Sequence, residues 1–205
     1  MPGLFFPGEL YPDESVGAGI EVYRNVWPDP EGTISLIEEE CQNTESGIDW
    51  AKAGVFGQDN NQNYRTNYDL GITFCAKQGN VVCQSVHNQM YTLLMAAIDP
   101  YKKHYGLEED LWHEGYNILK YSTGQEYKKH YDGQTLTGRT VSAIIYLNDD
   151  FEGGEVEFVN FNVKIKPEPG MLILFPSNYP YSHIAHPVTS GTKYALVTWL
   201  ADREV

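Results

Sequence analysis

Two histidines and one aspartate carry the chemistry that this sequence most clearly offers. His130 and Asp132 are separated by one residue, and His183 follows much later in the chain. Two imidazoles and one carboxylate form a ligand set that holds a divalent iron and leaves coordination positions open. On an extended segment, residues two apart project to the same face, so His130 and Asp132 can reach one ion together. The pattern indicates an iron-dependent oxygenase rather than a binding module.

The third ligand has a competitor, because His186 lies just beyond His183 and has the same chemistry. Further along, Lys193 begins an apolar segment that ends at Leu200. A lysine in that position can extend its ammonium to solvent. If it points inward instead, it needs a carboxylate to offset the loss of hydration. An acidic cosubstrate would supply that carboxylate.

The second half of the chain, which must position these residues, has the pattern of short strands. Gly, Pro and Asn turns separate β-rich segments, and no helical pattern intervenes. With one earlier strand at 19–23, we expect strands at 116–121, 140–147, 154–158, 162–166, 171–175 and 193–200. Such spacing is typical of an antiparallel sandwich or barrel. N-terminal helices are expected to pack on this β-structure.

The first half of the chain supplies those helices. A helix is predicted from 32 to about 41, with Thr33 as its N-cap. Residues 43–68 are polar and turn-rich, which is typical of a surface loop. The longest helix is predicted over 82–104, where apolar side chains recur at spacings of three and four. His87 lies on that apolar stripe and is expected to be a core histidine rather than a ligand.

Composition excludes several other classes. The 205 residues are 41% hydrophobic and 13% aromatic, which indicates a globular domain with a sizeable core. No apolar run approaches the length of a membrane span. The first residues lack the basic and apolar regions of a signal peptide, so we expect a cytoplasmic protein. Cys41, Cys75 and Cys83 have no CxxC spacing and are expected to be reduced thiols.

The net charge of −14 makes nucleic acid a poor partner, because the surface repels phosphates. Most of the excess lies in the first hundred residues, which carry 14 acidic and 4 basic side chains when counted along the sequence. A cationic peptide would be favoured electrostatically, although solubility alone also accounts for such a surface.

Four segments resemble, in order, the prolyl 4-hydroxylases, a family of 2-oxoglutarate- and iron(II)-dependent dioxygenases. They are residues 121–132, 146–158, 169–176 and 183–199. The resemblance implies an α+β fold, namely a double-stranded β-helix (jelly roll) core with supporting N-terminal helices. A single catalytic domain would span 1–205. Its arm, first strands and supporting helices would lie in 1–110, and the iron and 2-oxoglutarate sites in 111–205.

The resemblance assigns the iron ligands. His130, Asp132 and His183 would bind the metal. The family pattern of His-x-x-x-Pro-Val favours His183 over His186, since only His183 stands four residues before Pro187.

Five further residues receive roles from the same resemblance. Lys193 would hold the distal carboxylate of 2-oxoglutarate, and Tyr121 and Tyr146 would line its pocket. Arg139 and Trp199 would lie near the substrate proline. Arg139 and Tyr146 are seven apart, so a regular strand would put them on opposite faces. We therefore expect a bulge near the start of that strand, or a position of Arg139 at the rim.

The implied activity is hydroxylation of prolyl residues at the 4-position in a peptide or protein, with release of succinate and CO2. It would use iron(II), 2-oxoglutarate and dioxygen, with ascorbate as a candidate reductant. The alternative keeps these cofactors and changes the substrate to free proline, another amino acid or another side chain. A third interpretation is a non-catalytic β-roll that serves binding. Residues 56–68 and 134–137 are candidates for the rim of a peptide site, and no membrane partner is expected.

Overall fold

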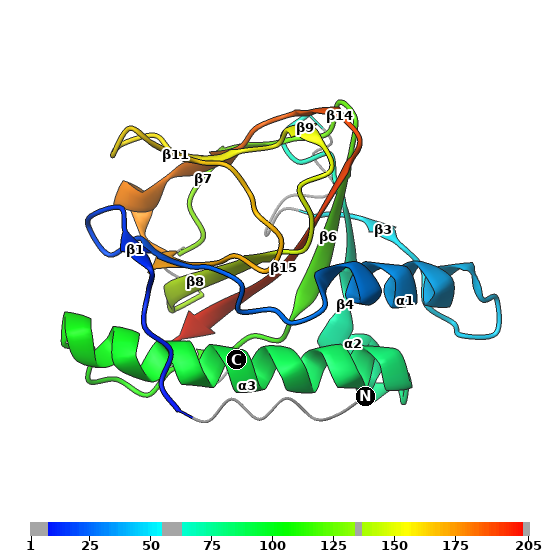
Figure 1. Cartoon of the computed structure of the whole chain (residues 1–205), viewed down its shortest axis with the longest axis horizontal. Coiled ribbons are helices and arrows are strands. Elements are labelled where there is room, and N and C mark those ends of the chain that lie inside the picture. Colours follow the sequence, from blue (N-terminus) through cyan, green and yellow to red (C-terminus); the bar gives the residue numbers. More distant parts are fainter. Residues whose placement is uncertain (1–7, 55–62, 134–136, 203–205) are drawn as a thin grey trace.

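Two β-sheets face each other in the computed structural model, and helices cover the outer face of the larger one (Figure 1). The structure describes residues 8–54, 63–133 and 137–202. The segments 56–68 and 134–137, which we considered as rims of a peptide site, lie for the most part outside these residues. Within the described part of the chain, no helix is long and apolar enough to cross a membrane.

The larger sheet is antiparallel and contains most of the strands predicted from the sequence. Its order is β1 (Glu14–Ser15), β2 (Glu21–Tyr23), β12 (Leu172–Pro176), β8 (Arg139–Tyr146), β15 (Thr192–Ala201), β6 (Asn117–Ser122), β4 (Tyr68–Gly71) and β3 (Ala51–Lys52), and β5 (Trp112–His113) pairs with β15. Strand β15 is a central strand of this sheet, because it pairs with β8 on one side and with β6 on the other.

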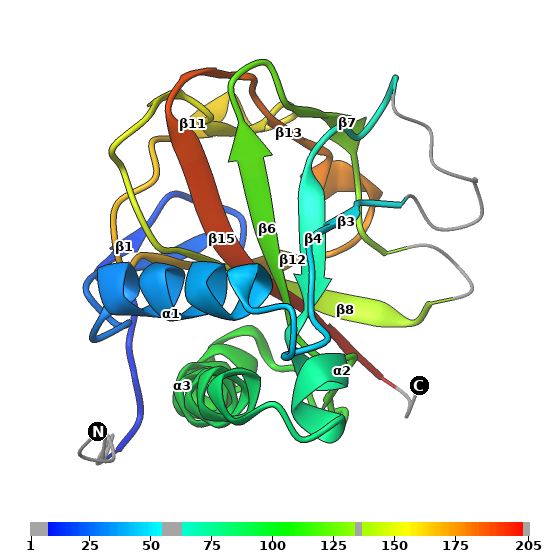
Figure 2. The same ribbon diagram turned by 90° about the vertical axis from the view of Figure 1, so that its right-hand side faces the viewer.

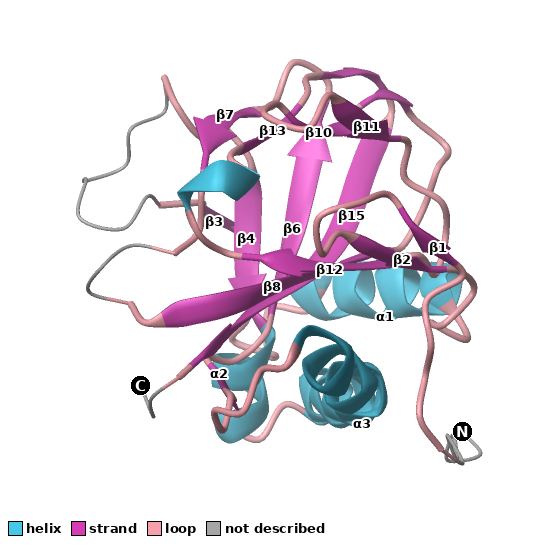
Figure 3. Ribbon diagram, turned by 90° about the vertical axis from the view of Figure 1, so that its left-hand side faces the viewer, coloured by secondary structure: helices cyan, strands magenta, loops and turns pink. Residues whose placement is uncertain are grey.

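The smaller sheet stacks over the open face of the larger one. Its order is β11 (Val163–Ile165), β10 (Val156–Phe158), β13 (His183–Ala185) and β7 (Tyr127–His130). A separate ladder joins β9 (Glu152–Gly153) to β14 (Val188–Ser190), and a 3-10 turn, η1 (Tyr179–Tyr181), precedes β13. In Figure 3 this smaller sheet lies on the side of the larger sheet that is opposite to the helices.

Three helices cover the outer face of the larger sheet, namely α1 (Pro30–Gln42), α2 (Ile72–Lys77) and α3 (Val81–Tyr105) (Figure 2). The apolar stripe of α3 packs against the strands to form the main core. Among its fully buried side chains are Met90, Leu93 and Leu94 on α3 and Ile118, Ile145 and Leu196 on the sheet. His87 lies at the edge of this core, where its Nδ1 is 3.0 Å from the Thr73 hydroxyl.

The prediction of Thr33 as the N-cap of the first helix was wrong. Asp29 caps α1 by accepting a hydrogen bond from the Gly32 N–H at 3.0 Å, and Pro30 occupies the first helical position. Proline suits that position because its missing N–H would have no partner within the helix. The Thr33 hydroxyl instead accepts a hydrogen bond from the Trp27 indole.

Candidate metal and cosubstrate site

The three predicted metal ligands lie together at the edge of the smaller sheet. His130 ends β7 and His183 begins β13, and the antiparallel pairing of these strands puts the two residues directly opposite each other. Their ring centroids are 4.2 Å apart. Asp132 follows just beyond β7, and one ligand atom from each of the three residues lies within 4.8 Å of the others. A single ion can therefore be shared by all three.

Hydrogen bonds to backbone carbonyls orient both imidazoles. The Lys128 carbonyl accepts from Nδ1 of His130 at 2.8 Å, and the Tyr181 carbonyl accepts from Nδ1 of His183 at 3.0 Å. Since a carbonyl can only accept, each Nδ1 must carry the proton, and each Nε2 keeps a free lone pair. These Nε2 atoms lie 3.7 and 4.0 Å from the Asp132 carboxylate. This arrangement of a metal-facing nitrogen and an anchored one is typical of metal-binding histidines.

The charges of the cluster fit a divalent cation. Burial is the main reason that the pKa of His130 falls to about 3, so this imidazole is neutral. Burial alone would raise the pKa of Asp132, but the neighbouring imidazoles and the Ser142 hydroxyl outweigh it and lower that pKa. The result is a buried carboxylate beside a neutral imidazole. Within the described residues, no lysine or arginine forms an ion pair with this carboxylate, so an iron(II) ion would supply the missing positive charge.

Ser142 fixes the orientation of the carboxylate. Its hydroxyl donates to Oδ2 of Asp132 at 2.7 Å and lies 2.8 Å from the Ser177 hydroxyl. We expect Ser142→Ala to weaken iron(II) binding about tenfold, because outer-shell partners of metal ligands contribute that much to affinity. Anaerobic titration with iron(II) measures the change. Ser35→Ala, which removes an exposed hydroxyl from α1, is the control, and equal affinities of the two variants would contradict the role of Ser142.

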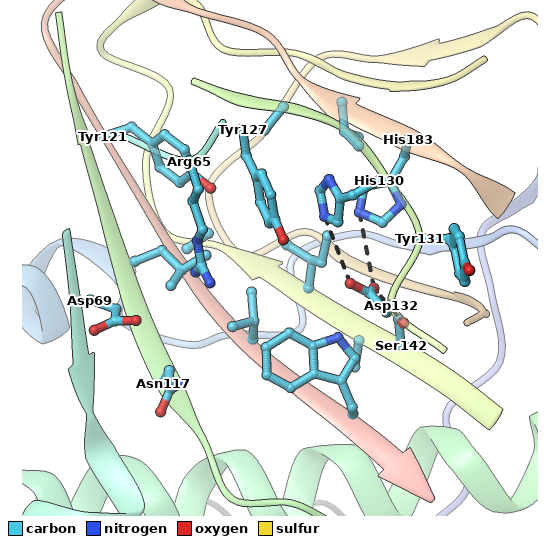
Figure 4. A pocket seen from close by; sticks show the side chains of 18 of the residues that line it. Arg65, Asp69, Asn117, Tyr121, Tyr127, His130, Tyr131, Asp132, Ser142 and His183 are labelled. Carbon is cyan, nitrogen blue, oxygen red and sulfur yellow. Dashed lines mark hydrogen bonds and ion pairs between the residues drawn. The ribbon is translucent and has the colours of Figure 1, made fainter. Parts of the chain in front are cut away.

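A cavity of about 430 Å³ extends from the ligand cluster between the two sheets (Figure 4). Lys193 lies in its lining with an exposed fraction of 2%. The ammonium donates to the Gly154 carbonyl at 2.8 Å and lies over the Tyr121 ring, 4.4 Å from its centroid. Tyr146 lines the same cavity. Lys193, Tyr121 and Tyr146 thus share one cavity with the candidate ligands.

The surroundings of Lys193 favour the binding of an anion next to its ammonium. No carboxylate of the described chain forms an ion pair with its ammonium, and burial lowers its pKa to about 7 although Glu155 acts in the opposite direction. A buried cation without a counter-ion is costly to keep in an apo protein. The carboxylate of an acidic ligand in the cavity would offset that cost, which is the fit expected for 2-oxoglutarate.

The low pKa of Lys193 predicts a pH-dependent affinity for 2-oxoglutarate. Below a pH of about 7 the free ammonium is already charged, whereas above it the lysine must take up a proton before it can pair with a carboxylate. Affinity should therefore be constant at low pH and fall by up to about tenfold per pH unit above 7. Calorimetry in two buffers of different ionisation enthalpy measures the proton uptake. A flat profile with no proton uptake would contradict the assignment.

Arg139 and Trp199 form one wall of the cavity. The register between β8 and β15 shifts between Leu200 and Ala201, which places Arg139 opposite Ala201 and on the cavity face. The expected bulge is therefore present. Both oxygens of Glu114 accept from the Arg139 guanidinium, at 2.7 and 2.5 Å, and the guanidinium stacks on Trp199 with 3.9 Å to the ring centroid. Arg139 is thus a fixed part of the wall rather than a free surface charge.

Several cavity residues were not singled out from the sequence. The Tyr127 ring stacks on His130 with 3.4 Å between ring centroids, and the Arg65 guanidinium lies over the same Tyr127 ring. Ser142 could have been found, because it stands four residues before Tyr146 on the same strand face. Arg65 lies in a segment that we predicted to be a loop, and the apolar residues of that segment show no helical or strand period. Its contacts depend on tertiary packing, so the sequence pattern could not reveal them.

His186, the competitor for the third ligand position, lies elsewhere. Its Nε2 is 2.7 Å from the Glu157 carboxylate. Glu157 stands on β10 opposite Ile184 and also pairs with Lys164, so the His186 ring is held in a partly exposed group of charged residues. Only His183 of the two histidines belongs to the cluster with His130 and Asp132.

Comparison with known families gives an independent result. Residues 116–201 match the family model of the 2OG-Fe(II) oxygenase superfamily. A probable prolyl 4-hydroxylase 9 of Arabidopsis thaliana is 32% identical in an alignment 120 residues long, and the match covers 44% of this chain and 42% of the plant protein. Prolyl 3-hydroxylase 2 of Homo sapiens is 41% identical in an alignment 68 residues long, and the match covers 31% of this chain and 10% of the human protein. The chain thus spans less than half the length of these relatives.

Solved structures agree on the fold. A prolyl hydroxylase of Trichoplax adhaerens, solved with a peptide fragment of the hypoxia inducible factor oxygen degradation domain, superposes with a TM-score of 0.71 at 18% identity. The match covers 90% of this chain and 84% of that one. This match confirms the jelly-roll fold expected from the sequence. The family resemblance is supported by the family model and by the curated relatives. The family match and the ligand cluster agree on iron(II) and 2-oxoglutarate as the cofactors.

Proposed function

We propose that this chain hydroxylates prolyl residues of a peptide or protein at the 4-position, with release of succinate and CO2, because its residues 116–201 match the family model of the 2OG-Fe(II) oxygenase superfamily. One observation carries the proposal. A single cavity holds the cluster of His130, Asp132 and His183 and, in its lining, the buried ammonium of Lys193. The cluster would bind an iron ion, and the ammonium would pair with a carboxylate of an acidic cosubstrate.

In this proposal each side chain has a defined task. His130 and His183 would hold the iron through Nε2, and Asp132 through its carboxylate, while Ser142 keeps that carboxylate in place. Lys193 would pair with the distal carboxylate of 2-oxoglutarate. The bound iron supplies the activation of dioxygen and the cleavage of the substrate C–H bond.

The walls of the cavity would exclude water and fix the cosubstrate. The Lys193 ammonium lies over the Tyr121 ring, and Tyr146 and several apolar side chains line the same cavity. In such a dry environment an ion pair between the ammonium and a carboxylate is stronger than in water. The apolar cavity face therefore contributes to selection of a dianionic cosubstrate.

The substrate side is assigned to Arg139 and Trp199. The flat indole offers a surface for the compact ring of proline, whose φ is fixed by its own covalent structure. The ion pair with Glu114 prevents Arg139 from moving away from the indole. Support for a peptide substrate comes from the Trichoplax adhaerens enzyme, which was solved with a peptide fragment.

The test supplies iron(II), 2-oxoglutarate and a panel of proline-containing peptides, with ascorbate as reductant. We expect a peptide product heavier by one oxygen atom, formed only when 2-oxoglutarate is present. Acid hydrolysis and chromatography then separate 4-hydroxyproline from 3-hydroxyproline. Absence of any product from a broad panel, with intact iron binding, would refute prolyl hydroxylation of peptides.

Two alternatives keep the same cofactor chemistry. The likeness to a human prolyl 3-hydroxylase favours the 3-position as the second candidate. The other alternative is a different substrate, namely free proline, another amino acid or another side chain. In that case succinate release would depend on that compound rather than on a proline-containing peptide. If no compound stimulates succinate release, the β-roll serves binding alone.

We treat 1–205 as one catalytic domain, because β2 of the first half and β12 of the second half belong to the same sheet. Free thiols at Cys41, Cys75 and Cys83 support a cytoplasmic location. The net charge of −14 supports a partner other than nucleic acid.

A further inference from the structure

Asp69 puts a carboxylate on the cavity face of β4. The pairing of β4 with β6 sets Asp69 opposite Leu119 and Leu70 opposite Ile118. Because strand residues alternate between faces, Asp69 shares the face of Leu119, which lines the cavity, while Leu70 packs into the core beneath the helices. Figure 4 shows Asp69 and Asn117 on the side of the cavity away from His130 and Asp132.

The Asp69 carboxylate has no partner to satisfy it within the described chain. No hydrogen bond and no ion pair within 4.0 Å joins it to residues 8–54, 63–133 or 137–202. Burial raises its pKa, and Arg65 acts in the opposite direction. Its oxygens are not fully buried, so they remain accessible to a cationic group that enters the cavity.

Arg65, the cation whose charge acts on Asp69, makes its hydrogen bonds with other residues. Its Nε donates to the Asn67 side chain at 3.0 Å and its Nη1 to the Gly54 carbonyl at 2.9 Å. The guanidinium also lies over the Tyr127 ring, 4.9 Å from the centroid. These contacts hold Arg65 against neutral acceptors and an aromatic face. They leave the Asp69 carboxylate open to a cation from outside the chain.

The other charged groups of the cavity already have tasks. Arg139 is paired with Glu114, Asp132 belongs to the ligand cluster, and Lys193 has the cosubstrate as its proposed partner. The described lining of the cavity contains two carboxylates, Asp69 and Asp132, and of these Asp69 has no role in that scheme. The net charge of −14 would also attract a cationic peptide to this protein.

We propose that Asp69 is a specificity-determining residue that pairs with a lysine or arginine side chain flanking the target proline. The inference rests on the proposed function, because it concerns the substrate of the same cavity. The preference for residues next to the proline does not depend on the iron and 2-oxoglutarate sites, since Asp69 lies on β4, outside the ligand cluster. The substrate class is therefore a basic proline-containing peptide.

The test measures peptide binding to the protein loaded with iron(II) and 2-oxoglutarate under anaerobic conditions, so that no turnover occurs. Fluorescence anisotropy compares labelled peptides that differ only in lysine or norleucine at one position near the proline. For the wild-type protein we expect about tenfold tighter binding of the lysine peptide at one of the scanned positions, and a smaller ratio at high salt. In Asp69→Asn, which keeps the shape of the side chain, the ratio should approach one.

Asp99→Asn is the matched control, because it removes the same charge from an exposed position on α3, beyond the opposite face of the sheet. It should keep the wild-type ratio. The proposal is overturned if the wild type shows no preference for lysine at any position, or if Asp69→Asn keeps the full preference. Binding is measured without turnover, so the two proposals can fail separately. A lysine preference that depends on Asp69, in a protein that hydroxylates no peptide, would refute the proposed function and leave the pairing of Asp69 with a basic peptide standing.

Discussion

Replacing His183 by alanine is expected to reduce iron-dependent succinate release at least about 100-fold while the protein stays folded. The change removes one of the three donors, and its Nε2 lies 4.0 Å from the Asp132 carboxylate that completes the cluster. Loss of even an outer-shell partner costs metal sites about 10- to 100-fold, so loss of a direct ligand should cost more. Succinate formation at saturating 2-oxoglutarate measures turnover, and circular dichroism measures folding.

The matched control is His186→Ala. It removes the same side chain three residues further on, where the imidazole contacts Glu157 outside the ligand cluster. We expect turnover within about twofold of the wild type, as is usual for partly exposed pairs that contribute little. If His186→Ala abolished turnover and His183→Ala did not, the ligand assignment would be wrong.

Replacing Lys193 by methionine should raise the KM for 2-oxoglutarate about 100-fold, which corresponds to about 3 kcal/mol, with a smaller change in kcat. Methionine keeps the length and apolar stem of lysine but removes the charge that would pair with the distal carboxylate. The apo protein should not lose thermal stability, because the variant removes a buried ammonium that lacks a counter-ion. Initial rates over a range of 2-oxoglutarate concentrations give both constants.

Lys120→Met is the control for that experiment. Lys120 lies on β6 and pairs with Glu38 of α1 at 2.8 Å, on the helix-covered side of the sheet. Its loss should leave the KM for 2-oxoglutarate unchanged. An unchanged KM in Lys193→Met would show that the cosubstrate carboxylate binds elsewhere.

The sequence predicted the parts of the fold that depend on local pattern. Strand β15 was expected over 193–200 and runs over Thr192–Ala201, because its apolar residues alternate in a long uninterrupted segment. Helix α3 was expected over 82–104 and runs over Val81–Tyr105, since its stripe of apolar residues has the helical period. His130, Asp132 and His183 were identified because few residue types can bind a metal and their order matches a family pattern.

Features that depend on tertiary pairing could not be predicted in the same way. Strands β7 and β13 are short and carry no clear alternation, yet their pairing is what brings His130 opposite His183. Strand β4 begins at Tyr68, within a segment that we expected to be a surface loop, and only its pairing with β6 reveals that Asp69 faces the cavity. The cap of α1 was misplaced by local competition between Thr33 and Asp29, which the proline at position 30 decides.

The most direct test of the central claim is a crystal structure of the protein with iron(II) and 2-oxoglutarate, in which anomalous scattering locates the iron. We predict one iron bound by Nε2 of His130, Nε2 of His183 and the Asp132 carboxylate, with the distal carboxylate of 2-oxoglutarate at the Lys193 ammonium. An iron bound away from these three side chains, or a cosubstrate whose distal carboxylate lies far from Lys193, would contradict it.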